Sequence, residues 1–386
     1  MSNNAKDILI DRRMELPIQP NKNNKYFPSY VSVILNDYIE LLEEYNFDNS
    51  IITRISDFRD NIFNSLESYY GGDQCGAYEF FKDAMLAIDP SQEHLIITLN
   101  ENEFYRARIS NNDNDFDKNQ MFHVPFEMRT KISTQRYSFP GLPCLYLGGS
   151  TFTCWNEIGK PSYDNLNIAL IKTKPNEVIK VVDLCQTPQF ILQEYQKTNN
   201  TVLLINYIRI WPLIAVCSFC VTDEYGFFKP EYIIPQMLLQ WLMKEIDILR
   251  PNWNVKGIRY FSVKPNNAGN VKNQLFLNYN RLYTNYVFPI IISKTKGHCE
   301  ILEQMFEVYS TISGKTASMA LPQRNTGVFY GDNPPEEDIT SEYSEYIVLP
   351  DGQKTLYSQS IFDWIEKILK ADQTISSLDG DLFFQT

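Results

Sequence analysis

The stretch from Arg136 to Glu157, "RYSFPGLPCLYLGGSTFTCWNE", carries three residues that could do chemistry together. Tyr146 follows Arg136 by ten residues, and Glu157 follows Tyr146 by eleven. An arginine fork can hold a pyrophosphate in a planar, bidentate way that lysine does not match. A carboxylate can stabilise positive charge that develops in a transition state. The pattern predicts a site for an anionic ligand that has a cationic leaving group.

Two other apolar runs add polar residues to this set. In "FYRARI", side chains alternate between the faces of a strand, so Arg106 and Arg108 share one face, opposite Tyr105 and Ala107. The run "VKGIRYFS" ends in Ser262. We expect the two arginines and the serine to lie near the Arg136–Glu157 stretch.

Four of these residues also have an ordinary structural interpretation. Tyr146 and Ser262 could be core residues, and Arg108 could belong to a surface ion pair. Glu157 could be a carboxylate at a helix N-terminus, where the helix dipole favours negative charge. Only the joint occurrence of the set, in one order, favours a functional site.

That order resembles the RES domain family, named for its Arg, Glu and Ser. The resemblance covers roughly residues 103–290 and rests on Arg106, "QRYSFPGLPCLYL", Glu157 and "GIRYFS". The segment "EYIIPQMLLQWL" resembles the helix that comes before the serine motif. One departure is Gln135, which stands where the family usually has glycine before its second arginine. The chain also has an N-terminal helical unit and a C-terminal extension that small RES toxins lack.

The resemblance implies a fold similar to that of ADP-ribosyltransferase toxins and an activity on NAD. Glu157, Arg106 and Ser262 would be the catalytic residues. Arg106 and Arg136 would hold the diphosphate, Tyr146 would stack on nicotinamide or ribose, and Ser262 would hydrogen-bond the ribose or the amide. NAD would be the substrate, and no metal is expected. Most members are toxins that are paired with a small antitoxin, so a small antitoxin or a regulatory protein as partner, and a role in bacterial defence, are further expectations.

Three functions remain open at this stage. The first is an NAD-degrading toxin, either a glycohydrolase or a phosphorylase, that cleaves the nicotinamide–ribose bond. The second is a protein ADP-ribosyltransferase. The third is a non-catalytic module that binds NAD or regulates another protein. The sequence alone does not choose whether water, phosphate or a protein side chain accepts the ADP-ribosyl group.

The elements around these residues predict an α+β fold with an ADP-ribosyltransferase-like mixed β core. We expect a leader and helical unit over residues 1–100, a RES-like catalytic domain over 101–295, and an extension with an acidic loop and a terminal helix over 296–386. Apolar residues at helical spacing predict helices over 30–47, 52–70, 76–88, 230–249 and 358–373. β-type runs predict strands over 104–109, 143–149, 167–173, 178–184, 207–221, 255–263 and 281–292.

Charge limits the classes of partner. The formal net charge of the 386 residues is −12, and residues 331–386 hold twelve Asp and Glu but only three Lys. Such a balance argues against a non-specific grip on nucleic acid or anionic lipid, which needs clustered Lys and Arg. The acidic segment from Gly331 is either a solvated surface, or a docking surface or lid over a cationic site.

Other patterns also exclude functions. The N-terminus lacks the apolar core of a secretory signal, and no apolar run is long enough to span a membrane. The seven cysteines show no disulfide framework, so we expect a cytoplasmic protein. "SGKTAS" has Tyr309 where a phosphate-binding loop needs its first glycine. "CSFC" has no second pair, so Cys217 and Cys220 are interpreted as buried thiols in a core strand rather than zinc ligands.

Overall fold

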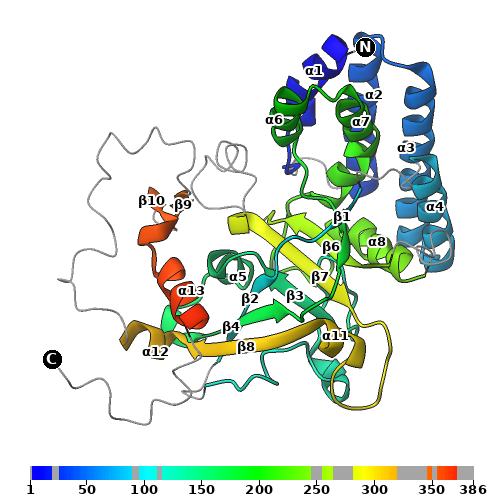
Figure 1. Ribbon diagram of the computed structural model, residues 1–386. Coiled ribbons are helices and arrows are strands. Elements are labelled where there is room, and N and C mark those ends of the chain that lie inside the picture. The colour runs from blue at the N-terminus through cyan, green and yellow to red at the C-terminus, as the bar shows by residue number, and fades with distance from the viewer. Residues whose placement is uncertain are drawn as a thin grey trace.

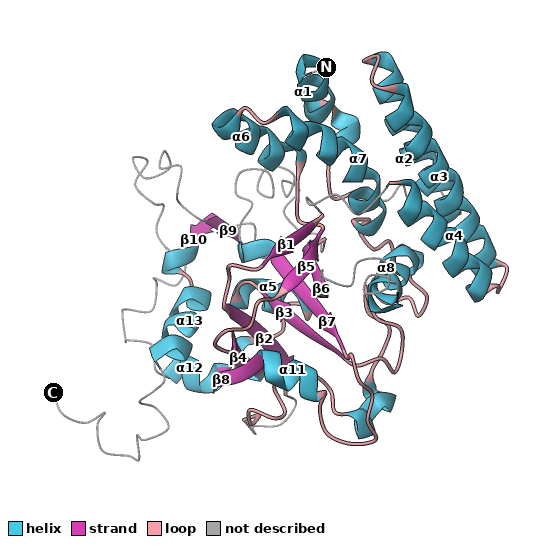
Figure 2. Cartoon of the chain, turned by 45° about the vertical axis from the view of Figure 1, so that its right-hand side comes forward, coloured by secondary structure: helices cyan, strands magenta, loops and turns pink. Residues whose placement is uncertain are grey.

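The computed structural model describes residues 2–19, 26–88, 95–110, 115–244, 254–263, 281–319, 346–349 and 354–371. Within these residues the fold is α+β, as the sequence predicts: one large mixed sheet lies beneath a group of helices (Figures 1 and 2). No helix in these ranges is both long enough and apolar enough to cross a membrane.

The main sheet has eight strands in the order β1-β5-β6-β7-β3-β2-β4-β8. β5 and β6 are parallel, and the other neighbours are antiparallel. The strands are β1 (Ile96–Thr98), β2 (Glu103–Ile109), β3 (Cys144–Gly148), β4 (Leu166–Thr173), β5 (Lys180–Asp183), β6 (Val255–Phe261), β7 (Thr284–Pro289) and β8 (Phe306–Ser313). A separate hairpin pairs β9 (Tyr346–Val348) with β10 (Lys354–Leu356).

A group of helices lies above the sheet (Figure 2). It contains α1 (Ser2–Ile10), α2 (Phe27–Glu44), α3 (Asn49–Tyr70), α4 (Gln74–Ala87), α6 (Pro188–Thr198) and α7 (Thr201–Cys217). α8 (Ile233–Lys244) packs against both this group and β6. Four further helices pack against strands of the sheet: α5 (Thr151–Glu157), α11 (Glu300–Met305), α12 (Gly314–Met319) and α13 (Ile361–Ala371).

The predicted strand over 207–221 is wrong, because most of it is helix α7. The continuous apolar run reflects burial on all sides, which strands and buried helices share. Pro212 lies inside the helix and cannot donate to the carbonyl four residues earlier. The Tyr38 hydroxyl donates to that carbonyl, Ile208 O, at 2.7 Å. Cys217 and Cys220 are buried thiols as expected, but at the end of α7 and in the loop beyond it.

The other predicted strands and helices are found where their described residues allow a comparison. The sequence did not indicate the helices α1, α5, α6, α11 and α12 or the strands β1, β8, β9 and β10. Residues 325–345 of the predicted acidic loop lie outside the described residues, and so do residues 245–249 of the predicted long helix. The division at residues 100 and 295 stays a prediction, although the sheet takes β1 and β8 from the two flanking parts.

Two apolar cores lie on opposite faces of β2 and β4. The smaller core joins Tyr105 of β2 to apolar side chains of α5 and α13, and its members from β4 are Leu166, Ile168 and Leu170. Phe104, Ala169 and Ile171 belong to the larger core. This alternation confirms that Tyr105 and Ala107 share one face of β2, opposite the two arginines.

Candidate active site

A cavity of about 990 Å³ lies where the ends of several elements meet. Small-molecule sites usually measure roughly 300–1,000 Å³. The lining includes Tyr146, Tyr232, Tyr260 and Asn285. Two acidic side chains in the lining are Glu157 and Glu224, against five cationic ones from Arg106, Arg108, Lys131, Arg136 and Lys229. The balance of these charges suits an anionic ligand.

Glu157 reaches the cavity because α5 begins directly after β3. Gly148 and Gly149 end the strand, and a Cβ at Gly149 would collide with the carbonyl oxygen of Arg281. Ser150 then caps the helix, since its hydroxyl accepts a hydrogen bond of 3.0 Å from Thr153 N–H. Glu157 is the last residue of the helix.

Two buried donors hold the Glu157 carboxylate. The Ser262 hydroxyl donates to Oε1 at 2.5 Å, and Asn285 Nδ2 donates to the same oxygen at 2.8 Å. The interpretation of Glu157 as a helix N-terminal carboxylate is therefore wrong: it sits at the C-terminal end, where the helix dipole opposes negative charge. The two donors offset that opposition.

Ser262 is not one of the described residues that line the cavity. It is connected to the cavity through its hydrogen bond to Glu157. It follows β6 directly, and its backbone N–H donates to Tyr283 O at 2.8 Å. A direct contact between Ser262 and a ligand stays a prediction, whereas its contact with Glu157 is part of the structure.

Arg106 projects from β2 into the cavity. Its Nη1 donates to Tyr146 O at 2.9 Å. Within the part of the chain that the structure describes, its Nε is buried and has no hydrogen-bond partner. Burial, together with the charge of Arg108, lowers the pKa of Arg106 to about 10, so the side chain is still a cation at neutral pH. A buried cation with an unused donor is suited to an anionic ligand.

Arg136 has two roles: it holds backbone carbonyls in place and it lines the cavity. Its Nη1 donates to the carbonyls of Cys217 and Phe219, at 3.3 and 3.1 Å, and so neutralises the C-terminal end of α7. Its guanidinium lies 5.0 Å from the centroid of the Tyr232 ring, and both side chains line the cavity.

The loop that carries Arg136 is held by α8. Gln236 on this helix donates to the carbonyls of Gln135 and Ser138, at 2.9 and 3.3 Å. Gln135 N–H donates to Ser138 O at 2.8 Å, so Arg136 lies inside a tight turn. Gln135, which stands where RES domains usually have glycine, is therefore compatible with an ordered loop.

Tyr146 lines the cavity from the centre of β3. Its hydroxyl and that of Ser138 are 3.0 Å apart and share a hydrogen bond. Burial raises the pKa of Tyr146 well above its ordinary value, so the phenol is neutral and suited to packing or stacking rather than to proton transfer. Arg108 also lines the cavity, but its partners are Gln120 O and the Phe116 ring rather than the carboxylate of a surface pair.

Sequence reasoning missed Asn285 and Tyr232. Asn285 could have been noticed as a polar side chain near the start of the β-type run "TNYVFP". A polar side chain in a buried strand needs a hydrogen-bond partner. Tyr232 gave no such signal, since a tyrosine at the start of an apolar helix is ordinary.

No protein-family model matches the chain, and no solved structure matches it. A protein of Bacillus subtilis (strain 168) named "Putative toxin YopC" is 32% identical to it over 326 residues. The alignment covers 80% of this chain and 70% of that protein. Identity at this level over most of both chains shows common descent, and the chain therefore belongs to the same family as YopC.

Proposed function

We propose that this protein is an NAD-degrading toxin of the cytoplasm, built on an ADP-ribosyltransferase-like core of the RES type. One observation carries the proposal: Glu157, fixed by Ser262 and Asn285, shares a cavity with Arg106, Arg136 and Tyr146. The name of its relative supports the toxin part. A small antitoxin is the partner that we propose for it.

The chemistry follows from where charge develops. When the bond between nicotinamide and ribose breaks, its electron pair leaves with nicotinamide and the ribose ring becomes positively charged. A carboxylate beside the ring stabilises this state more than it stabilises bound NAD. Water or phosphate then attacks the ribose carbon and gives ADP-ribose or its phosphate. In this proposal Arg106 and Arg136 hold the diphosphate, and the neutral Tyr146 ring stacks on the substrate.

Purified full-length protein tests the proposal. NAD loss is measured with and without phosphate, and mass spectrometry separates ADP-ribose from ADP-ribose phosphate. Glu157→Gln should abolish turnover. Glu194→Gln, which changes a carboxylate paired with Lys197 on α6, is the matched control and should leave it unchanged. Equal NAD loss in wild type and Glu157→Gln would falsify the proposal.

A second candidate, a protein ADP-ribosyltransferase, is favoured by the rim of the cavity. Tyr225 lines the rim and is 95% exposed, and Phe227, two residues on, is fully exposed. Exposed aromatic side chains beside a site often contact a protein partner. NAD labelled in its adenylate phosphate decides between the two candidates: label transferred to protein in a lysate supports the transferase, and label recovered only in small molecules supports NAD degradation.

A further inference from the structure

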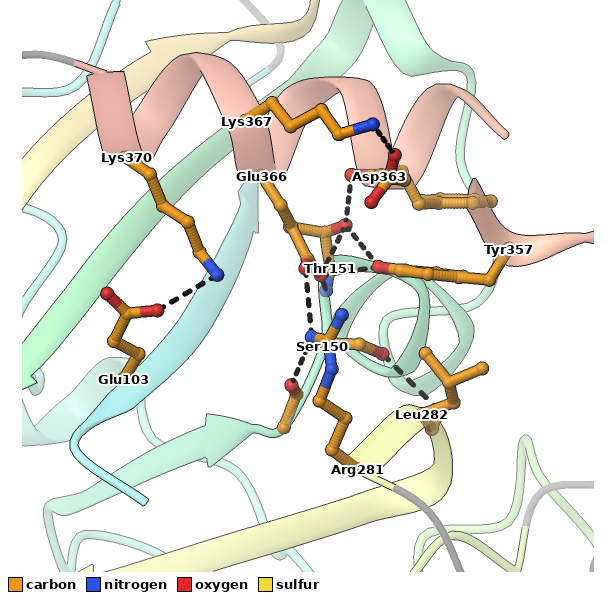
Figure 3. A network of polar contacts seen from close by, with 12 residues as sticks. Glu103, Ser150, Thr151, Arg281, Leu282, Tyr357, Asp363, Glu366, Lys367 and Lys370 are labelled. Carbon is orange, nitrogen blue, oxygen red and sulfur yellow. Dashed lines mark hydrogen bonds and ion pairs between the residues drawn. The ribbon is translucent and has the colours of Figure 1, made fainter. Parts of the chain in front are cut away.

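Glu366 of α13 is a buried carboxylate, far from the cavity residues in sequence and only 2% exposed. Its Oε1 accepts a hydrogen bond from the backbone N–H of Thr151 at 2.9 Å and another from the Tyr357 hydroxyl. Its Oε2 accepts from Arg281 Nη1 at 2.8 Å (Figure 3). These hydrogen bonds converge on one point of the fold.

That point is the beginning of α5. Thr151 is the first residue of the helix, where a negative charge is favoured by the helix dipole. The Thr151 hydroxyl donates to Phe362 O on α13 at 3.1 Å. Arg281 also donates to Gly149 O, just before the helix, at 3.2 Å. The start of α5 is therefore tied to α13 through backbone and side chains.

The side of α5 also packs on α13. Phe152 and Trp155 each lie 5.2 Å, centroid to centroid, from the Phe362 ring. α5 has seven residues and is therefore about 10 Å long. A helix this short moves as one body, so a tilt at Thr151 displaces Glu157 at the other end.

α13 in turn is fixed to the sheet. Lys370 forms an ion pair of 2.9 Å with Glu103 of β2, the strand that also carries Arg106 (Figure 3). The Ser310 hydroxyl on β8 donates to Leu369 O at 2.6 Å. The helix thus connects the two elements that bring Glu157 and Arg106 to the cavity.

A buried carboxylate such as that of Glu366, whose partner Arg281 is partly exposed, is a costly way to attach a helix. Apolar side chains of similar volume often stabilise a fold as well or better, because burying charge carries a desolvation cost. Compared with apolar packing, the hydrogen bonds of Glu366 and Arg281 also fix the orientation of the helices, because a hydrogen bond forms only within a narrow range of distances and angles.

We propose that Glu366 is a positioning residue: from α13 it fixes the start of α5 and thereby the place of Glu157 in the cavity. The catalytic part of this inference rests on the proposed function. The mechanical part, that Glu366 controls the far end of α5, does not.

Three variants of the full chain test the inference. Glu366→Gln keeps the volume but removes the charge that pairs with Arg281. Tyr357→Phe removes a single donor to Glu366 and is the milder variant, to be used if Glu366→Gln fails to fold. Lys367→Ala is the matched control, because Lys367 lies on the same helix but pairs with Asp363 of α13 at 2.6 Å (Figure 3).

The first readout is amide hydrogen exchange, resolved along residues 151–158. Without Glu366 we expect exchange at Asn156, Glu157 and Ile158 to be at least about tenfold faster than in Lys367→Ala, because loss of an anchor lowers the local opening free energy. Tyr357→Phe should change it less, in the same direction. Exchange at these three amides equal to that of the control would overturn the inference, whatever the activity.

The second readout is NAD turnover beside NAD binding. Glu366→Gln should lower kcat about tenfold or more through misplacement of Glu157, while the Kd for NAD stays within about twofold, because the arginines lie on other elements. Faster exchange with an unchanged kcat would overturn the catalytic part of the inference, that Glu366 places Glu157 for the reaction. If the wild type consumes no NAD but the exchange result is as expected, the mechanical inference stands and the proposed function fails.

Discussion

The Ser262 hydroxyl lies 2.5 Å from Oε1 of Glu157 and donates a hydrogen bond to it. Ser262 follows β6 and Glu157 ends α5, so this contact joins two of the three residue types that name the RES family. Asn285 of β7 donates to the same oxygen. The serine of the motif is therefore part of the support of the glutamate, whether or not it also contacts a ligand.

The first prediction concerns these two donors. Ser262→Ala and Asn285→Ala should each lower kcat for NAD roughly tenfold, the scale of one lost hydrogen bond to a charged group. The double variant should lose less than the product of the two effects, because both donors serve one oxygen. Steady-state kinetics measures this, with the surface variant Asn61→Ala as control. Fully multiplicative losses would contradict a shared role.

The second prediction separates the two roles of Arg136. Arg136→Ala should lower the free energy of unfolding by about 1–3 kcal/mol, because the carbonyls of Cys217 and Phe219 lose their buried partner. It should also raise the Kd for NAD. Urea unfolding and calorimetric NAD titration measure the two effects. A variant of unchanged stability would show that the end of α7 does not need Arg136.

The third prediction is on Tyr146. Because burial raises its pKa well above the ordinary value, the phenol should not transfer protons. Tyr146→Phe should keep kcat within about threefold and leave the pH–rate profile unchanged, since it keeps the ring and loses the hydroxyl that shares a hydrogen bond with Ser138. Tyr146→Ala should raise KM through loss of the ring. A Tyr146→Phe variant with a new pH dependence would contradict this assignment.

The fourth prediction is a pH dependence of stability. His123 is fully buried; its Nε2 accepts from Cys299 N–H at 2.8 Å, and burial lowers its pKa to about 4. The unfolded chain, with a histidine pKa near 6.5, binds this proton more readily, so stability is lost as pH falls from about 6.5 toward 4.

From about pH 7 to about pH 5 His123 should contribute a loss of roughly 2 kcal/mol. Urea unfolding at the two pH values measures it. His123→Gln should be less stable at neutral pH but should lose less on acidification than the wild type, which separates His123 from Glu127 and other groups that titrate nearby. Equal losses in both proteins would show that His123 is not the source.

The sequence predicts the strands near the candidate site well, because each is a short apolar run bounded by Gly, Pro or Asn, as "PCLYLGG" shows for β3. It failed for α7, where burial on every side removes the periodicity that separates helix from strand. It also missed β8, whose exposed and half-buried residues dilute the β-type pattern.

For the candidate site, the order of residues in the sequence was enough to predict that Arg106, Arg136, Tyr146 and Glu157 lie close together, and all four line one cavity. The hydrogen-bond partners of these residues could not be predicted in this way. The carbonyls that hold Arg136 lie more than 80 residues away in the chain, and backbone atoms leave no mark in a sequence. Asn285 and Glu366 are likewise single polar residues whose meaning depends on contacts that only the fold creates.

The attachment of α5 to α13 has a consequence for synthesis. A ribosome synthesises the chain from the N-terminus onward, and α13 follows all eight strands of the main sheet in the sequence. Until α13 has been synthesised, Thr151 lacks the carboxylate of Glu366 that accepts its N–H in the folded protein. A nascent chain that stops short of α13 can therefore hold every residue of the cavity and still lack the contact that orients its glutamate, so the competence of the site depends on the synthesis of α13.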